Sequence, residues 1–62
     1  MNSVWHKHFF VPGGDEDRER VDAVEYEDGT IYVIDIRTGE RARCFTRDFA
    51  VRVAERLSGV RR

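Results

Sequence analysis

The 62-residue sequence contains one cysteine, one proline and no long apolar run, and each scarcity excludes a class of protein. Cys44 has no second cysteine with which to form an internal disulfide, so the fold must hold without one. A lone thiol is typical of proteins in a reducing compartment. No segment is long and apolar enough for a signal peptide or a membrane span. We therefore expect a cytoplasmic protein that does not associate with membranes.

The short length predicts a single domain with a small core. A domain of about 60 residues buries only about 60% of the surface that its unfolded chain exposes. Domains of this size usually gain stability from disulfides, a metal or a second copy of the chain. Because the disulfide is excluded here, a homo-oligomer or a larger protein partner is the expected supplement.

Charge is unevenly distributed along the chain, although the net charge is only -1. Residues 1–31 carry three basic and eight acidic side chains, whereas residues 32–62 carry eight arginines and four acids. Such asymmetry can mark an acidic or a basic binding surface. Two halves that fold against each other would instead neutralise much of it, and the sequence leaves both interpretations open.

The pattern of apolar residues and turn signals predicts four strands. Pro12 ends the first strand, the Asp28-Gly29 pair is typical of a tight hairpin, and residues 37–39 predict a second hairpin. Residues 13–20 consist of charged residues and glycine, so we expect a mobile acidic loop there. The expected strands are residues 3–11, 21–26, 30–36 and 41–45.

The last part of the chain changes to a helical period and predicts a helix over residues 47–58. Thr46 is expected to cap its start, and Gly59 to end it in the left-handed conformation. The expected core stripe of this helix is Phe49, Ala50, Val53, Ala54 and Leu57, with Val51 outside it. The predicted fold class is α+β: a small antiparallel β-meander of three to four strands with one C-terminal helix packed on one face.

The predicted strand over residues 30–36 is apolar on both sides, which is unusual in so small a protein. A three-residue turn at residues 37–39 would decide which side the helix covers. The face beneath the helix would then contain Tyr32, Ile34, Ile36, Ala42 and Cys44. One short helix cannot cover both faces, so the opposite face is left open.

This open face is the leading candidate for function. The first strand could fold across it and bring Trp5, Phe9 or Val11, or a second molecule could cover it, most simply in a C2 dimer. Covering about 300 Å² of apolar surface is worth about 7 kcal/mol before entropic costs. We therefore expect a small non-enzymatic protein–protein interaction module that either self-associates as a homodimer or docks a larger protein partner. The expected partner-binding residues are Ile31, Val33, Asp35, Arg43 and Phe45.

Nucleic-acid binding through the basic C-terminal half is the alternative function. Arg41 and Arg43 share one strand face with Phe45, and an aromatic ring between arginines on a sheet can stack a base. Arg61 and Arg62 would extend this patch. The sequence isoelectric point of about 6.1 argues against a general phosphate-binding surface.

The remaining chemistry-bearing residues predict neither a metal site nor a catalytic centre. His6 and His8 fall on one strand face, but two imidazoles bind zinc only when further ligands such as Asp35 or Cys44 converge on them. No spacing in the sequence requires that convergence. Cys44 lies between apolar neighbours, as a small core residue does. We therefore expect no metal, no cofactor and no catalytic residue.

Overall fold

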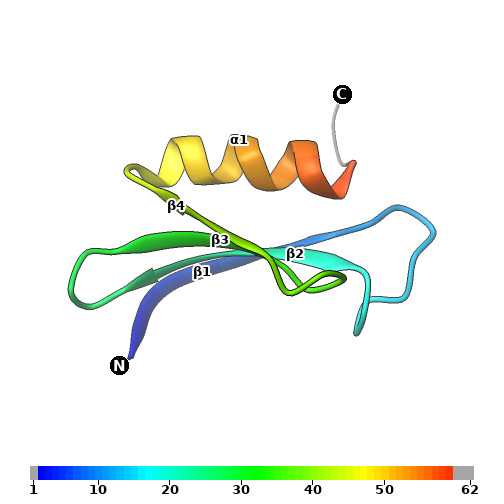
Figure 1. The fold of residues 1–62 in the computed structure, drawn as a ribbon, viewed down its shortest axis with the longest axis horizontal. Coiled ribbons are helices and arrows are strands. Elements are labelled where there is room, and N and C mark those ends of the chain that lie inside the picture. Colours follow the sequence, from blue (N-terminus) through cyan, green and yellow to red (C-terminus); the bar gives the residue numbers. More distant parts are fainter. Residues whose placement is uncertain (1, 60–62) are drawn as a thin grey trace.

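The computed structural model describes residues 2–59, which form a four-stranded antiparallel sheet with one helix packed on one face (Figure 1). The strands follow one another across the sheet in chain order, so the fold class predicted from the sequence is confirmed. No helix within residues 2–59 combines the length and the apolarity needed to cross a membrane. The elements are β1 (Ser3–Phe10), β2 (Arg20–Tyr26), β3 (Ile31–Asp35), β4 (Arg41–Cys44) and α1 (Arg47–Ser58).

Both ends of α1 are fixed by the residues that the sequence indicated. Thr46 has an extended backbone, and its hydroxyl accepts from the Phe49 N–H at 3.1 Å. Gly59 ends the helix with φ of 82°, and its N–H donates to the Glu55 carbonyl. A hydroxyl N-cap and a left-handed C-terminal glycine satisfy backbone groups that the helix itself leaves unpaired.

The turn between β3 and β4 is one residue longer than predicted. The Asp35 N–H donates to the Glu40 carbonyl at 2.8 Å, so four residues, 36–39, form the loop. Val33 then lies opposite Ala42, and Ile34 lies opposite Arg41. Because side chains alternate along a strand, this shift of one residue exchanges the two faces of β3.

The predicted assignment of the two sheet faces is therefore wrong. Ile31, Val33 and Asp35 were expected on the open face, but they lie beneath α1 with exposed fractions of 5%, 1% and 9%. Tyr32 and Ile34, which were expected beneath the helix, occupy the open face and are half-buried. Ala42 and Cys44 do lie on the helix side, as predicted.

Small residues bring the helix close to the sheet. Ala50 and Ala54 on α1 and Ala23 on β2 are fully buried in the contact. Phe49 and Leu57 were expected in the core but are 55% and 43% exposed, because the helix turns its alanines rather than these larger side chains towards the sheet. Val51, expected outside the core stripe, packs against the core together with Val53 and Trp5. The buried core cluster consists of Phe9, Val21, Ala23, Ile31, Val33, Cys44, Ala50 and Ala54.

The first strand extends the sheet and does not fold across its open face. β1 pairs with β2, with His6 opposite Val24 and Phe9 opposite Val21, and the register shifts once, between Ser3 and Trp5. Phe9 is buried on the helix side, and Trp5 packs there as well. The face of the sheet away from α1 is thus left without cover by any other element of residues 2–59 (Figure 1).

The acidic segment between β1 and β2 is held by its own hydrogen bonds. The Glu19 N–H donates to the Asp15 carbonyl, and the Glu19 carboxylate accepts from the Asp15 N–H at 2.8 Å. The Val11 N–H donates to the Glu19 carbonyl at 3.0 Å, which closes the loop at the end of β1. Of the predicted acidic loop over residues 13–20, the part up to Glu19 therefore forms an organised turn at one end of the sheet, and Arg20 already belongs to β2 (Figure 1).

Candidate interaction surface

The open face is the side of the sheet opposite α1, and it is rich in aromatic and basic side chains. It is built from alternate residues of all four strands, because side chains of a strand point to opposite faces in turn. Val24 is its most buried member, with 9% of its surface exposed, because it lies between its partners on the neighbouring strands. The open face consists of His6, His8, Phe10, Arg20, Asp22, Val24, Tyr26, Tyr32, Ile34, Arg41 and Arg43.

The side chains of the open face are ordered in rows across the sheet. One row runs from His6 through Val24 and Tyr32 to Arg43. The next row runs from His8 through Asp22 and Ile34 to Arg41 in the same way. Each row thus has an imidazole at the β1 edge and a guanidinium at the β4 edge.

Aromatic rings support both arginines at the β4 edge. The Arg41 guanidinium lies 5.9 Å from the centre of the Tyr32 ring, and Tyr32 makes an edge contact with Tyr26. The Arg43 guanidinium lies 5.3 Å from the centre of the Phe45 ring. Phe45 follows directly after β4 and is 80% exposed. These cation–π contacts hold two positive charges over exposed aromatic surface.

Asp22 is the only carboxylate among the residues of the open face, and it is already paired. Its Oδ1 lies 2.7 Å from His8 Nδ1 and accepts from Arg20 Nε at 3.0 Å. The pairing with Arg20 leaves Arg41 and Arg43 as the charges offered to a partner. The open face therefore presents a local excess of positive charge on a chain whose net charge is -1.

The structure separates the residues that the sequence grouped as a site. Arg43 and Phe45 lie together on the open side, whereas the apolar residues predicted beside them are buried beneath the helix. Arg41 also lies on the open face, which agrees with the expected nucleic-acid patch. Arg61 and Arg62 of that patch lie outside the described residues.

The histidines and the cysteine do not come together. His6 and His8 are neighbours on the open face, with ring centres 4.9 Å apart, whereas Cys44 is buried on the other side of the sheet. Within residues 2–59, no group of three or more histidine, cysteine or carboxylate side chains is placed to hold a metal ion. Burial raises the pKa of the Cys44 thiol, which disfavours the thiolate form that a nucleophile needs.

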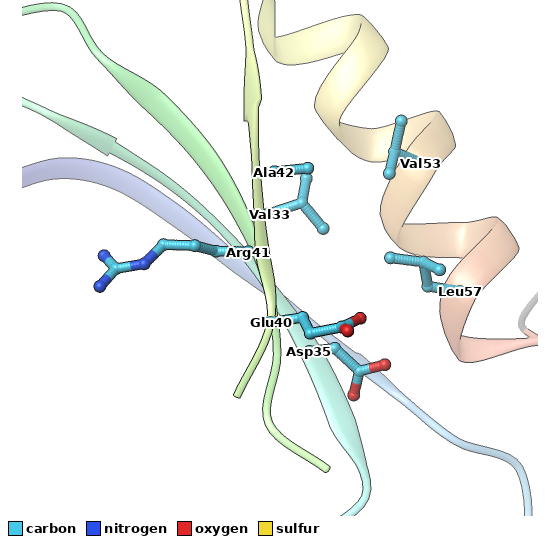
Figure 2. Close-up of a pocket in the computed structure, with 7 residues that line it drawn as sticks. All are labelled: Val33, Asp35, Glu40, Arg41, Ala42, Val53 and Leu57. Atoms are coloured by element: carbon cyan, nitrogen blue, oxygen red, sulfur yellow. The ribbon is translucent and has the colours of Figure 1, made fainter. Parts of the chain in front are cut away.

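A second surface lies where α1 meets the β4 edge. α1 leaves a groove of about 290 Å³ beside this strand. Val33 and Ala42 form its floor, and Val53 and Leu57 of α1 face them across it (Figure 2). The Arg41 side chain points away from this groove to the other side of the sheet (Figure 2). We call this feature the edge groove.

The edge groove continues along the outer side of the helix. A second hollow of about 340 Å³ shares Val53 and Leu57 and is otherwise lined by Phe49, Arg52 and Arg56. Phe49, Val53 and Leu57 are spaced four residues apart, so they form one exposed or half-exposed apolar stripe. Arg52 and Arg56 lie along the rim of this stripe.

An ion pair closes one end of the edge groove. Arg37 binds the Asp35 carboxylate through two N–H groups at 3.1 Å and donates to the Leu57 carbonyl at 2.8 Å. The hydrogen bond from Arg37 lowers the pKa of the Asp35 carboxyl, although burial opposes this effect. Arg37, held by the Asp35 carboxylate, thus ties the β3–β4 loop to the end of the helix, and the Asp35 side chain is only 12% exposed.

Several residues of these two surfaces were missed by sequence reasoning. A three-residue turn at residues 37–39 predicts Tyr32 beneath the helix, whereas the actual four-residue loop puts it on the open face. Phe49 and Leu57 were assigned to the core because their spacing fits a helical stripe. The distinguishing signal was residue size, since Ala50 and Ala54 form a parallel stripe of small residues, which lets a helix lie close to a sheet.

Comparison of the chain with protein-family models, with characterised proteins and with solved structures finds no match.

Proposed function

We propose that the chain is a small non-enzymatic interaction module that docks a protein partner on the open face. The observation that carries this proposal is the ordered surface of aromatic, apolar and arginine side chains on a sheet face that the described chain leaves uncovered. Tyrosine and arginine are enriched among the residues that dominate the binding energy of protein interfaces. The buried lone thiol of Cys44 agrees with a place in the cytoplasm.

The charge of the open face favours a different protein over a second copy of this chain. Two copies that met through this face would bring together two sets of Arg41 and Arg43, while the one carboxylate, Asp22, is already paired with Arg20. Like charges brought together at an interface are unfavourable. A partner with an acidic rim around an apolar centre would instead complement both the arginines and the Tyr32–Ile34 surface.

Single-stranded nucleic acid is the second candidate partner. It is favoured by one specific observation, that Arg41 and Arg43 lie on the same face as Tyr26 and Tyr32 and not beneath the helix. Open sheet faces with aromatic rings stack bases, and arginines bind the phosphates between them. Two phosphate contacts would give a shallow dependence of affinity on salt, with a log–log slope of about -1.4 for a single strand.

A photo-cross-linking experiment tests the proposal. A benzophenone amino acid is introduced at Tyr32 in the cells that produce the protein, and at Glu55 on the helix as the matched control. We expect a defined protein adduct from position 32 and none from position 55. The purified partner should then bind at least about tenfold more weakly to Arg43→Glu, because that change reverses one charge of the open face.

Each other outcome of the cross-linking experiment is informative. Adducts with nucleic acid from position 32, together with salt-dependent binding of a labelled oligothymidine, would replace the protein partner by the second candidate. An adduct with the protein itself, together with a dimer mass in light scattering, would show self-association instead. Equal adducts from both positions would contradict docking on the open face.

A further inference from the structure

β4 is one of the two edge strands of the sheet, and no other strand of residues 2–59 pairs with its outer side. Thr30 and Ile36, on either side of β3, both bond to β2: the Tyr26 N–H donates to the Thr30 carbonyl, and the Ile36 N–H donates to the Arg20 carbonyl. Because bonding alternates along an antiparallel pair, the even-numbered residues of β3 between them also bond to β2. The odd-numbered ones bond to β4, as the Asp35 N–H does to Glu40. Because bonding alternates along an antiparallel pair, the backbone groups of Arg41 and Arg43 point outward from the sheet edge.

This free edge lies directly beside the edge groove. Ala42, between the two arginines, is exposed on the helix side and forms part of the groove floor (Figure 2). Val53 and Leu57 face it from α1, and the remaining stripe residue, Phe49, is 55% exposed. An extended chain that paired with β4 would therefore direct alternate side chains into an apolar groove.

The charges along β4 indicate which charge the remaining side chains of the added strand should carry. Those that do not enter the groove would lie on the open side of the sheet, next to Arg41 and Arg43. Opposite charges on neighbouring strands stabilise a sheet, and like charges destabilise it. Arg52 and Arg56 add positive charge along the outer rim of the groove.

We propose that the β4 edge and the edge groove bind an extended segment of a partner protein in which apolar and acidic side chains alternate. The segment adds a fifth strand to the sheet, with its apolar side chains between Ala42 and Leu57 and its carboxylates at Arg41 and Arg43. This inference deepens the proposed function and rests on it for the choice of a protein partner. The site shares the Arg41 and Arg43 side chains with the open face, but it differs in using the backbone of β4 and the outer side of α1.

A second copy of the chain is a poorer occupant of this edge. Centring a strand pair on Ala42 places Arg41 of one copy opposite Arg43 of the other, and centring it on Arg43 places that residue opposite itself. The two helices would also bring together Arg52 and Arg56 of both copies beside the joined strands. A partner segment with acidic side chains opposite Arg41 and Arg43 avoids all of these repulsions between arginines.

A synthetic peptide tests strand addition without knowledge of the natural partner. The probe is a blocked seven-residue peptide in which glutamate and valine alternate, titrated into ¹⁵N-labelled protein. We expect the amide signals of Arg41 and Arg43 to shift and their hydrogen exchange to slow, because these N–H groups become bonded. A lysine–valine peptide should bind at least about tenfold more weakly. A peptide N-methylated along the edge that meets β4 should not bind.

Matched variants locate the binding site. Leu57→Glu places a charge in the edge groove and should weaken the glutamate–valine peptide at least about tenfold. Val4→Glu makes the same kind of change at an exposed apolar residue of β1, at the far edge of the sheet, and should leave binding within about twofold. Circular dichroism of both variants checks that each remains folded.

Three results would overturn strand addition at β4: equal binding of the lysine peptide, unchanged amides at Arg41 and Arg43, or a dimer in which those amides are already protected by a second copy. If the peptide does not bind but position 32 still cross-links to a protein partner, only the strand-addition inference is wrong. If the peptide binds but position 32 gives no adduct, the open-face proposal is wrong and the edge site remains.

Discussion

The assignment of the two sheet faces predicts that, of two side-chain truncations in β3, the smaller one lowers the free energy of unfolding more. Val33→Ala removes two methyl groups from a side chain that is 1% exposed in the core beneath α1. Their lost burial costs about 0.8 kcal/mol each, and the cavity that remains raises the total to about 2–3 kcal/mol. Ile34→Ala removes three carbons, but from the half-buried open face, where we expect a loss of about 1 kcal/mol.

These losses are large relative to the total stability. A chain of 62 residues is expected to be stable by about 3–9 kcal/mol. With a urea dependence of about 1 kcal/mol per molar, Val33→Ala should lower the unfolding midpoint by about 2–3 M and Ile34→Ala by about 1 M. The assay is urea unfolding at low temperature, followed by the circular dichroism of α1 at 222 nm. A midpoint that falls further for Ile34→Ala than for Val33→Ala would refute the register of β3 and β4 described above.

Three further predictions concern the ends of the elements and the buried polar groups. Thr46→Ala removes the hydroxyl that accepts from Phe49 and should lower the free energy of unfolding by about 1 kcal/mol, measured by urea unfolding. Arg37 lowers the pKa of Asp35 below its ordinary value of 3.8, so the stability that this carboxylate contributes is present above about pH 3.8 and is lost as the pH falls through the folded-state pKa. Asp35→Asn should therefore be less stable at pH 7 and lose less stability on acidification, in unfolding curves between pH 7 and 2. Cys44 is buried with a raised pKa, so it should react with an aromatic disulfide reagent at least about tenfold more slowly in the folded protein than in urea.

Local signals predicted the ends of α1 and the strand order, because each depends on a few neighbouring residues. The Thr46 hydroxyl and the positive φ of Gly59 act within one helical turn, and both are as the sequence indicated. The hairpin at Asp28-Gly29 closes with Gly29 at φ of 90°, a conformation that favours glycine. These features make the order of β2, β3, β4 and α1 readable without tertiary information.

Local signals could not predict which side chains lie on which face of the sheet, because this depends on whether the β3–β4 loop has an odd or an even number of residues. Residues 37–39 suit a three-residue turn, and only the Asp35–Glu40 hydrogen bond shows that residue 36 belongs to the loop as well. With one residue more in the turn, the partner-binding residues predicted on β3 become core residues. The place of β1 was also open, since a segment of nine residues separates it from β2 and fixes neither its edge nor its face.

The size of the side chains at the two sheet edges explains why the groove lies beside β4. On the helix side of β1, Trp5 and Phe9 fill the space beside the core, and Arg47 lies over the Trp5 ring at 5.1 Å. Beside β4 the corresponding space holds the methyl group of Ala42 and, at one end, the side chain of Glu40, and Leu57 across the groove is 43% exposed. A larger residue at position 42 should therefore fill the groove beside β4, as Trp5 and Phe9 fill the space beside β1.

Ala42→Leu tests that reasoning. The new side chain would fill the groove against Val53 and Leu57, so we expect unchanged or slightly higher stability, by up to about 1 kcal/mol. Binding of the glutamate–valine peptide should fall at least about tenfold, because its apolar side chains lose their place, even though the backbone groups of Arg41 and Arg43 are still free. Ala42→Ser, which keeps the groove open, should bind as the parent does. If Ala42→Leu is folded and binds the peptide with unchanged affinity, side chains of the bound strand do not enter the groove, and the proposed alternation of apolar and acidic residues has no structural basis.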